Sequence, residues 1–180
     1  MQMKTPDIQE KMKKINTFLF DVDGVFTDGH ILLMPGGQFV RSMSTRDGYA
    51  IQYLIHQGYR VGIISGGASE SVKMRFEGLG VPSSHIFMQI RDKKEVFEEF
   101  LIVHQLNRAQ VLYMGDDLPD YPVMKSVGVS ACPKNAVQEI LELSDLVSGF
   151  KGGKGCVREI IEQVLRIQNQ WKIEAKITNN

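Results

Sequence analysis

The sequence predicts an α/β protein, built as a three-layer Rossmann-like parallel sheet with helices on both faces and a protruding β-hairpin. Short apolar runs alternate almost throughout with longer segments whose apolar residues recur at helical spacing. This alternation is typical of a parallel sheet with helical crossovers. Several apolar runs end directly in Asp, Ser or Gly. Because ligands bind at the carboxyl ends of the strands in such sheets, we expect the functional site there.

The composition limits the class of protein. The 180 residues are 43% hydrophobic, which predicts one domain over residues 1–180 with its own core. The 21 basic and 21 acidic residues balance, which argues against nucleic acid or an anionic membrane as a partner. Cys132 and Cys156 lack the spacing of a metal site, and we expect free thiols. No apolar stretch is long enough to span a membrane, and the charged N-terminus does not resemble a signal peptide, so we expect a cytoplasmic protein.

The first elements include the least regular part of the chain. Residues 1–14 are predicted to form a short, exposed helix with one weak apolar stripe, followed by a buried strand over 17–22. Residues 29–41 place two apolar stretches around a Pro-Gly-Gly turn, which predicts a β-hairpin. An exposed hairpin this apolar needs a cover. It could pack on its own domain, but we favour a cover supplied by another subunit.

The remaining elements alternate between strand and helix. Gly58 ends the first long helix, and the helix over 92–105 has a clear amphipathic pattern. We expect helices at 47–57, 69–79, 92–105, 136–143 and 157–167, strands at 59–65, 85–88, 111–117, 127–130 and 146–147, and a polar tail over about 171–180.

The first predicted strand runs into two carboxylates, Asp21 and Asp23, followed at once by Gly24. Their spacing of two puts both side chains on the same side of the chain, provided that the chain stays extended. Two like charges this close are costly unless a cation lies between them or one carries a proton. An isolated Asp-x-Asp is usually a solvated loop, so the residues at the other strand ends decide whether this pair belongs to a functional site.

Other strand ends supply the complementary groups. Ser65 follows the second long strand, Lys93 begins the helix after the short strand, and Asp116 and Asp117 follow the next strand. Phosphoryl transfer needs a nucleophile, cations that neutralise phosphate charge and a proton donor for the leaving oxygen. Clustered carboxylates suit Mg²⁺, which also binds substrate phosphate. The backbone beside Ser65 can donate hydrogen bonds to phosphate, and Lys93 supplies a positive charge.

The segment over residues 16–29, with Asp-Val-Asp-Gly-Val-Phe-Thr-Asp-Gly at its end, resembles the first motif of the haloacid dehalogenase superfamily. The resemblance covers nearly the whole chain and implies a magnesium-dependent phosphatase. It implies that Asp21 is the nucleophile, which forms an aspartyl-phosphate intermediate. It also implies that Asp23 is the general acid and base. The metal ligands would be Asp21, the backbone carbonyl of Asp23, and Asp116.

The same resemblance assigns the remaining roles. Ser65 with the Gly66 backbone would bind phosphate, and Lys93 would stabilise the charge of the transferring phosphoryl group. Asp117 would support the metal ligands without binding the metal itself, and Asp120 could hold Lys93 in place. In this superfamily a cap domain can follow the first motif or lie between the second and third, and neither interval here has room for one. The chain is therefore expected to lack a cap domain.

Four segments, at residues 21–29, 46–51, 115–124 and 152–159, are similar to those of the 3-deoxy-D-manno-octulosonate 8-phosphate phosphatases. That family acts on a small phosphorylated sugar acid in lipopolysaccharide synthesis. Its members are homotetramers whose hairpins pack together, so a neighbouring subunit would close the site in place of a cap. The residues that we consider for substrate contact or closure are Thr27, Asp28, Arg46, Gly67 and Lys154.

Gly67 departs from this pattern, because many members of the family have Arg there and the relatives that act on nine-carbon keto acid 9-phosphates tend to have Glu. Since the Glu is missing, the eight-carbon substrate is favoured, with a nine-carbon (nononate or sialic-acid type) phosphate as the alternative. A phospho-acceptor signalling module is an alternative from another class. Such receiver domains lack a second Asp two residues after the acceptor, so Asp23 argues for the enzyme.

Overall fold

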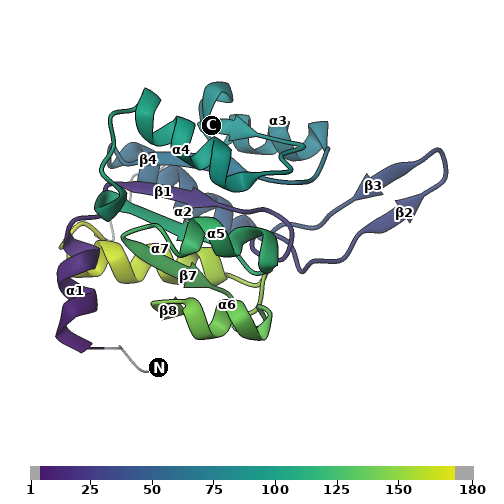
Figure 1. Ribbon diagram of the computed structural model, residues 1–180. Helices are drawn as coiled ribbons and strands as arrows, with labels where there is room; N and C mark the ends of the chain where they lie inside the picture. The colour runs from purple at the N-terminus through teal and green to yellow at the C-terminus, as the bar shows by residue number, and fades with distance from the viewer. Residues whose placement is uncertain (1–4, 173–180) are drawn as a thin grey trace.

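The computed structural model describes residues 5–172 and contains a six-stranded parallel sheet (Figure 1). The strand order is β5 (Ile86–Phe87), β4 (Arg60–Ile64), β1 (Thr17–Phe20), β6 (Val111–Met114), β7 (Val129–Cys132) and β8 (Leu146–Val147). The predicted α/β class is confirmed. The first strand lies in the centre, and the two strands beside it are those whose ends carry Ser65 and Asp116.

The register of β1 aligns these strand ends. Phe20 is opposite Ile63 on β4 and Met114 on β6. The amide of Asp21 continues the pairing and donates to the carbonyl of Met114 at 2.9 Å. Consequently the residue after β1 and the loop after β6 begin at the same edge of the sheet.

Helices cover both faces of the sheet, as the alternation predicts. Side chains on β1 alternate, with Phe18 and Phe20 in one apolar core and Leu19 in the other. The first core includes side chains of α1 (Thr5–Lys13), α2 (Thr45–His56), α3 (Glu70–Gly78) and α7 (Cys156–Ile167). The second includes those of α4 (Lys93–Val103), α5 (Tyr121–Met124) and α6 (Gln138–Leu143). Among the described residues, no helix is long and apolar enough to cross a membrane.

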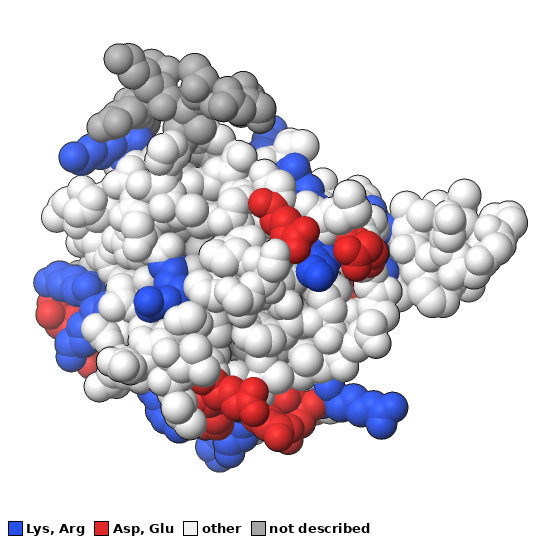
Figure 2. Space-filling model, turned by 90° about the horizontal axis from the view of Figure 1, so that it is seen from above, with Lys and Arg blue, Asp and Glu red and all other residues white. Residues whose placement is uncertain are grey.

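The predicted hairpin projects from this body (Figure 1) and consists of β2 (Leu32–Met34) and β3 (Gln38–Val40), paired antiparallel. Every residue of both strands is exposed, including Leu33 at 71% and Phe39 at 54%. Figure 2 shows the hairpin as a lobe without acidic or basic side chains on the visible face. The described chain leaves this apolar surface uncovered.

Several predicted boundaries and one predicted environment were wrong. The stripe of α1 is not weak and exposed, since Ile8, Met12 and Ile15 are at most 3% accessible. β1 ends at Phe20 rather than at residue 22, because the chain turns there and the amides of residues 25–27 donate to the carbonyl of Val22. Residues 1–4 and most of the predicted polar tail lie outside the described residues.

Two further differences concern the second half of the sheet. β7 begins two residues later than predicted, because the amide of Gly128 bonds to the carbonyls of Arg108 and Val111 in a turn. Residues 121–124 form the short helix α5, which the pattern did not predict. This helix is one turn long and has Pro122 near its start, so it shows no helical periodicity.

Candidate active site

Asp21 lies at the end of the central strand and is almost fully buried, with 6% of the residue exposed. The ammonium group of Lys93, at the start of α4, is 2.8 Å from its Oδ1. A buried carboxylate held by one cation keeps an exact position at the sheet edge. Asp21 is therefore a fixed nucleophile candidate rather than a mobile loop side chain.

Lys93 is itself fixed by Asp120, whose Oδ1 accepts from Nζ at 2.7 Å. Tyr113, on β6, donates its hydroxyl to the same oxygen at 2.7 Å. The other carboxylate oxygen accepts from the amide of Asp116 at 3.1 Å. Asp120 folds back over Gly115, where a Cβ atom would lie only 2.4 Å from its carboxyl carbon. Asp120 thus joins the lysine, the end of β6 and the loop that carries Asp116.

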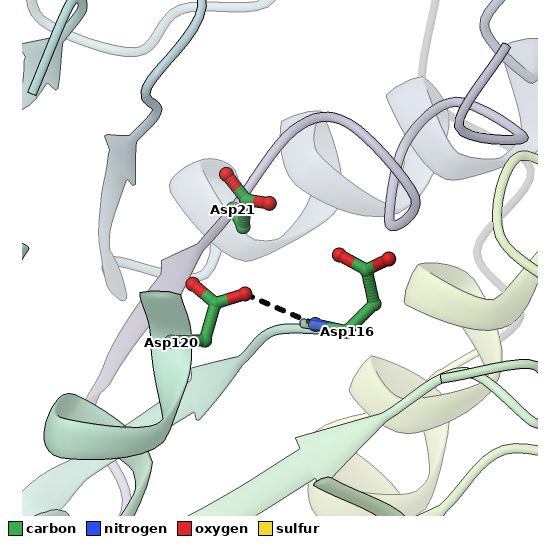
Figure 3. A group of neighbouring side chains, drawn as sticks. All are labelled: Asp21, Asp116 and Asp120. Atoms are coloured by element: carbon green, nitrogen blue, oxygen red, sulfur yellow. Dashed lines mark hydrogen bonds between the residues drawn. The ribbon is translucent and has the colours of Figure 1, made fainter. Parts of the chain in front are cut away.

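Three carboxylates converge at this edge of the sheet: Asp21, Asp116 and Asp120 can each offer an oxygen within 4.8 Å of the others (Figure 3). Asp116 Oδ1 is buried and has no hydrogen-bond partner among the described residues. A Cβ atom on Gly24 would lie 1.9 Å from Asp116 Oδ2, so only glycine lets the first loop pass this carboxylate. Because buried polar atoms are nearly always satisfied, the unpartnered oxygen marks a site for a ligand.

The electrostatics of the cluster agree with a cation site. Burial raises the pKa of Asp21 to about 7, with a further contribution from Asp120, and the contact with Lys93 opposes the shift. Burial also raises the pKa of Asp116 to about 8, and Asp21 and Asp120 add to it. Burial lowers the pKa of Lys93, but the two adjacent carboxylates outweigh it and raise the pKa overall. One lysine therefore does not balance the buried negative charge.

A divalent cation fits this donor set, which consists of hard oxygen ligands around an unsatisfied carboxylate. Asp21 and Asp116 are the side chains best placed to hold it. Asp120 is already engaged by Lys93, Tyr113 and the backbone, which leaves it to orient the others. The exposed side chain of Asp117 caps the following turn through the amide of Leu118 at 2.7 Å, and its own amide donates to Asp120 Oδ2 at 3.4 Å. Asp117 therefore contacts the turn that carries Asp120, and a supporting role for the metal ligands stays a prediction.

Asp23 points to different partners. The chain turns at Val22 instead of staying extended, so Asp21 and Asp23 do not share their contacts, contrary to what their spacing suggested. Both oxygens of Asp23 accept from Arg41, at 2.6 Å from Nε and 3.0 Å from Nη2. Sequence reasoning missed Arg41. The available signal was that it is the only charged residue in the apolar hairpin segment over 31–41.

Ser65 follows β4 and is buried, and its hydroxyl oxygen accepts from the amide of Gly67 at 3.1 Å. That contact leaves the hydroxyl hydrogen able to bond to an anion. Gly67 lies against the Asp23–Arg41 pair, since a Cβ atom there would be 3.1 Å from Asp23 Oδ2 and 3.2 Å from Arg41 Nη2. Gly66 lies between the two in this loop. The structure therefore brings the Ser65 loop to the side of Asp23.

The other substrate candidates divide into two groups. Thr27 is fully buried, and its hydroxyl accepts from the amides of Gly24 and Gly29 at 3.2 Å, so it holds the loop and is not available to a substrate. Asp28 accepts from the amide of His30 at 3.1 Å, which lowers the pKa of Asp28. Neither of these two residues shows an unused buried donor or acceptor.

Arg46 and Lys154 line a separate pocket of about 330 Å³, together with Phe150 and Arg158. None of the aspartates discussed above lines it. The structure thus brings the two predicted basic residues together, but in a pocket that the carboxylate cluster does not line.

The Gly-rich segment before α7 supports the first loop. A Cβ atom on Gly152 would lie 1.8 Å from the carbonyl oxygen of Gly24, and the amide of Gly153 donates to Val25 at 2.9 Å. Asn135 accepts from the amide of Gly152 at 2.9 Å. These contacts fix the first loop through its backbone.

Comparisons with known proteins agree with this geometry. Residues 83–160 match the family described as haloacid dehalogenase-like hydrolase. The 3-deoxy-D-manno-octulosonate 8-phosphate phosphatase of Yersinia pestis is 35% identical over 164 residues, which cover 91% of this chain and 87% of the relative. The corresponding enzyme of Escherichia coli K12 is 32% identical over 164 residues, with 91% and 86% covered.

Solved structures give the same result. The crystal structure of the Yersinia pestis phosphatase has a TM-score of 0.88 and 34% identity, covering 92% of this chain and 88% of that one. The phosphatase of Moraxella catarrhalis, solved in complex with magnesium ion, phosphate ion and a KDO molecule, has a TM-score of 0.88 and 31% identity, with 92% and 94% covered. The chain therefore belongs to the haloacid dehalogenase-like hydrolases, in the family of 3-deoxy-D-manno-octulosonate 8-phosphate phosphatases.

Proposed function

We propose that this protein is a magnesium-dependent phosphomonoester hydrolase that removes phosphate from 3-deoxy-D-manno-octulosonate 8-phosphate through an aspartyl-phosphate intermediate. The observation that carries the proposal is the buried Asp21, held by Lys93 at 2.8 Å beside the unpartnered oxygen of Asp116. That arrangement combines a fixed nucleophile, a fixed cation and an open metal position. The similarity to enzymes named for this substrate supports the choice of substrate.

The first chemical step uses Asp21 and Asp23. An oxygen of Asp21 attacks phosphorus, the bond from phosphorus to the ester oxygen breaks, and Asp23 gives its proton to the departing oxygen. Water then attacks the phosphorus of the acyl phosphate, Asp23 takes the proton from that water, and Asp21 leaves as a carboxylate. Lys93 stabilises negative charge on the phosphoryl group throughout, and Ser65 binds a phosphate oxygen.

Asp21 and Asp116 would hold the metal, and Asp23 would add its backbone carbonyl. When bound, Mg²⁺ neutralises the repulsion between the anionic nucleophile and the anionic substrate. The buried, unpaired charge of the cluster supports this assignment. The choice of Asp120 as a positioning group, not a ligand, follows from its four existing hydrogen-bond partners, which are Lys93, Tyr113 and the amides of Asp116 and Asp117.

The length of the sugar acid depends on the residues that line the substrate site. Gly67 lies beside Asp23 and carries no side chain that could select between substrates directly. A nine-carbon keto acid 9-phosphate therefore stays as the alternative. The panel experiment below separates the two.

The exposed hairpin supports an oligomer, which the family resemblance makes a tetramer. Six large apolar side chains of this segment are between 42% and 71% exposed: Ile31, Leu32, Leu33, Met34, Phe39 and Val40. Self-association would bury this surface and would bring a neighbouring subunit near the site in place of a cap domain. Sedimentation of wild type and Leu33→Asp tests this. A monomer that retains full activity would contradict it.

Phosphate release from a panel of phosphorylated sugar acids, with Mg²⁺ and with chelator, tests the whole proposal. We expect a strong preference for the eight-carbon phosphate and no release with chelator. Preference for the nine-carbon phosphate would favour the alternative, and activity that is indifferent to chelator would contradict the metal assignment.

A further inference from the structure

Arg41, the residue that follows β3, connects the exposed hairpin to the first acidic loop. Its guanidinium group makes a two-point contact with Asp23, at 2.6 Å and 3.0 Å. The Arg41 side chain is only 6% exposed, whereas that of Asp23 is 32% exposed. A two-point contact with a planar guanidinium fixes both the position and the plane of a carboxylate. The hydroxyl of Thr27 also donates to Asp23 Oδ1, at the longer distance of 3.4 Å. The shorter, two-point contact that holds Asp23 therefore comes from the point where the chain leaves the hairpin.

The third nitrogen of this guanidinium, Nη1, is buried and has no hydrogen-bond partner among residues 5–172. Native structures rarely leave a buried donor unsatisfied. Stability alone does not explain why this side chain is buried beside Asp23, because a shorter or apolar residue would leave no such donor. The cost of the unsatisfied donor points to a role for Arg41 in the reaction.

The loop after β4 makes room for the pair. A Cβ atom on Gly67 would lie 3.1 Å from Asp23 Oδ2 and 3.2 Å from Arg41 Nη2. Both distances are tighter than ordinary van der Waals contact. A larger side chain at position 67 would compete with Arg41 for this space. The glycine and the arginine therefore form one arrangement, although 26 positions separate them by their numbers, 41 and 67.

We propose that Arg41 is the positioning residue for Asp23 in proton transfer, and that Gly67 is the position that admits it. This inference rests on the proposed function. In the first step Asp23 must give its proton to the ester oxygen as the bond to phosphorus breaks. A carboxyl group has about four lone-pair sites, so Asp23 can carry this proton while Arg41 keeps hold of it.

A role in binding the substrate would have different consequences from a positioning role. Arg41 also borders a groove of about 810 Å³ between β3 and the start of α3. If it bound substrate there, its loss would raise KM for the sugar acid phosphate and leave kcat nearly unchanged. If it positions Asp23, its loss should lower kcat, and the decrease should be larger for a substrate whose leaving oxygen needs a proton.

The experiment measures kcat and KM separately for two substrates in the presence of Mg²⁺, and the decrease in kcat is the readout. The sugar acid 8-phosphate has a poor alkoxide leaving group, while p-nitrophenyl phosphate has a good one that needs little protonation. For Arg41→Met we expect a loss of about tenfold or more with the sugar phosphate and less than about threefold with the aryl phosphate, since general acids contribute about 10² or more. Arg41→Lys should recover part of the loss, because lysine restores the positive charge but cannot make the two-point contact of a guanidinium group.

Matched controls use pairs elsewhere in the chain. Arg108 makes a comparable two-point pair with Glu98 on the surface, so Arg108→Met should leave both substrates unaffected. Gly67→Ala, which presses on the pair without removing it, should show the Arg41 pattern more weakly. In an Asp23→Asn background, Arg41→Met should cause no further loss, because both act through the same group.

Equal decreases of kcat on both substrates, no decrease on either, or a change confined to KM for the sugar phosphate would overturn the inference for Arg41. Additive losses in the double variant would overturn it as well. If wild type instead releases phosphate from neither substrate, the proposed function fails, and this result is distinct from a failure of the Arg41 variants alone.

Discussion

Asp21 and Asp23 are two residues apart, but the structure surrounds them differently. Asp21 ends the central strand, is buried, and faces Lys93 and Asp120, which are carried by elements of the sheet edge. Asp23 lies in a turn, is partly exposed, and is held by Arg41 from the hairpin. The difference indicates a division of labour. In the proposed mechanism, the attack on phosphorus would use a residue at the end of a strand, and proton transfer would use a residue in a turn that Arg41 of the hairpin segment contacts.

The same contrast appears in the electrostatics. Burial and the carboxylate of Asp120 raise the pKa of Asp21, and the contact with Lys93 does not offset them. The contact with Asp23 raises the pKa of Arg41, so the guanidinium group stays positively charged at any ordinary pH. A divalent cation is therefore expected to act on the Asp21 side.

Replacing the nucleophile should have the largest effect. Asp21→Asn should abolish release of phosphate from both alkyl and aryl phosphates, because no other carboxylate can attack phosphorus from this position. Without metal, the Asp21→Asn variant should unfold at the same temperature as metal-free wild type or at a higher one. The substitution removes a buried carboxylate that neighbouring negative charge repels. Steady-state assays and thermal unfolding measure both. Substantial residual turnover would rule out Asp21 as nucleophile.

Asp23→Asn should cost about a hundredfold or more in kcat/KM for the sugar phosphate, the usual scale for a general acid. With p-nitrophenyl phosphate, kcat/KM should fall far less, because the good leaving group does not need the proton. The ratio of the two losses in kcat/KM measures how far Asp23 is needed only for proton transfer, whereas Asp21 is expected to be needed for both substrates. Equal losses for both substrates would remove the distinction between the two carboxylates.

Gly24→Ala tests whether Asp116 belongs to the metal site on the Asp21 side. The added Cβ would overlap Asp116, and the positive φ of +86° at Gly24 disfavours any side chain. We expect weaker Mg²⁺ activation, by about tenfold or more, as Asp116 is pushed away. Gly78→Ala is the matched control, because nothing lies within 4 Å of its Cβ position. Unchanged titration of activity with Mg²⁺ in Gly24→Ala would show that Asp116 does not hold the metal.

The pH dependence of metal binding should give the smallest effect. Folding raises the pKa of Asp21 to about 7 and that of Asp116 to about 8, so the ionised forms destabilise the metal-free protein as pH rises from the unfolded value near 4. The midpoint of thermal unfolding should therefore fall between about pH 5 and about pH 8 without metal. Mg²⁺ should raise it more at the higher pH, where protons do not compete. A rise that is the same at both pH values would contradict the carboxylate ligands.

Much of the sheet-edge region could be predicted from the sequence, because it depends on strand order and on which residue ends each strand. The apolar runs before Asp21, Ser65 and Asp116 read clearly, and parallel pairing aligns their ends. The contact between Lys93 and Asp120 also lies at these ends. Sheet geometry transmits such local signals over long sequence separations.

The loop region could be predicted far less well. Arg41 reaches Asp23 only because of the path that the chain takes out of the hairpin, and no local periodicity records that path. Thr27 looked like a substrate contact but turned inward to hold the loop. The side chain of Asp117 likewise accepts from a nearby backbone amide, that of Leu118, which the strand pattern did not predict.

The most direct test of the central claim is to find the phosphate on the enzyme. Asp23→Asn should form the acyl phosphate from p-nitrophenyl phosphate and hydrolyse it slowly, because the base that activates water is missing. After an acid quench, reduction of acyl phosphate with borohydride followed by peptide mass spectrometry locates the modified residue. We expect the label on Asp21 and its absence in Asp21→Asn. A label on another residue, or rapid turnover with no trapped acyl phosphate, would contradict the account.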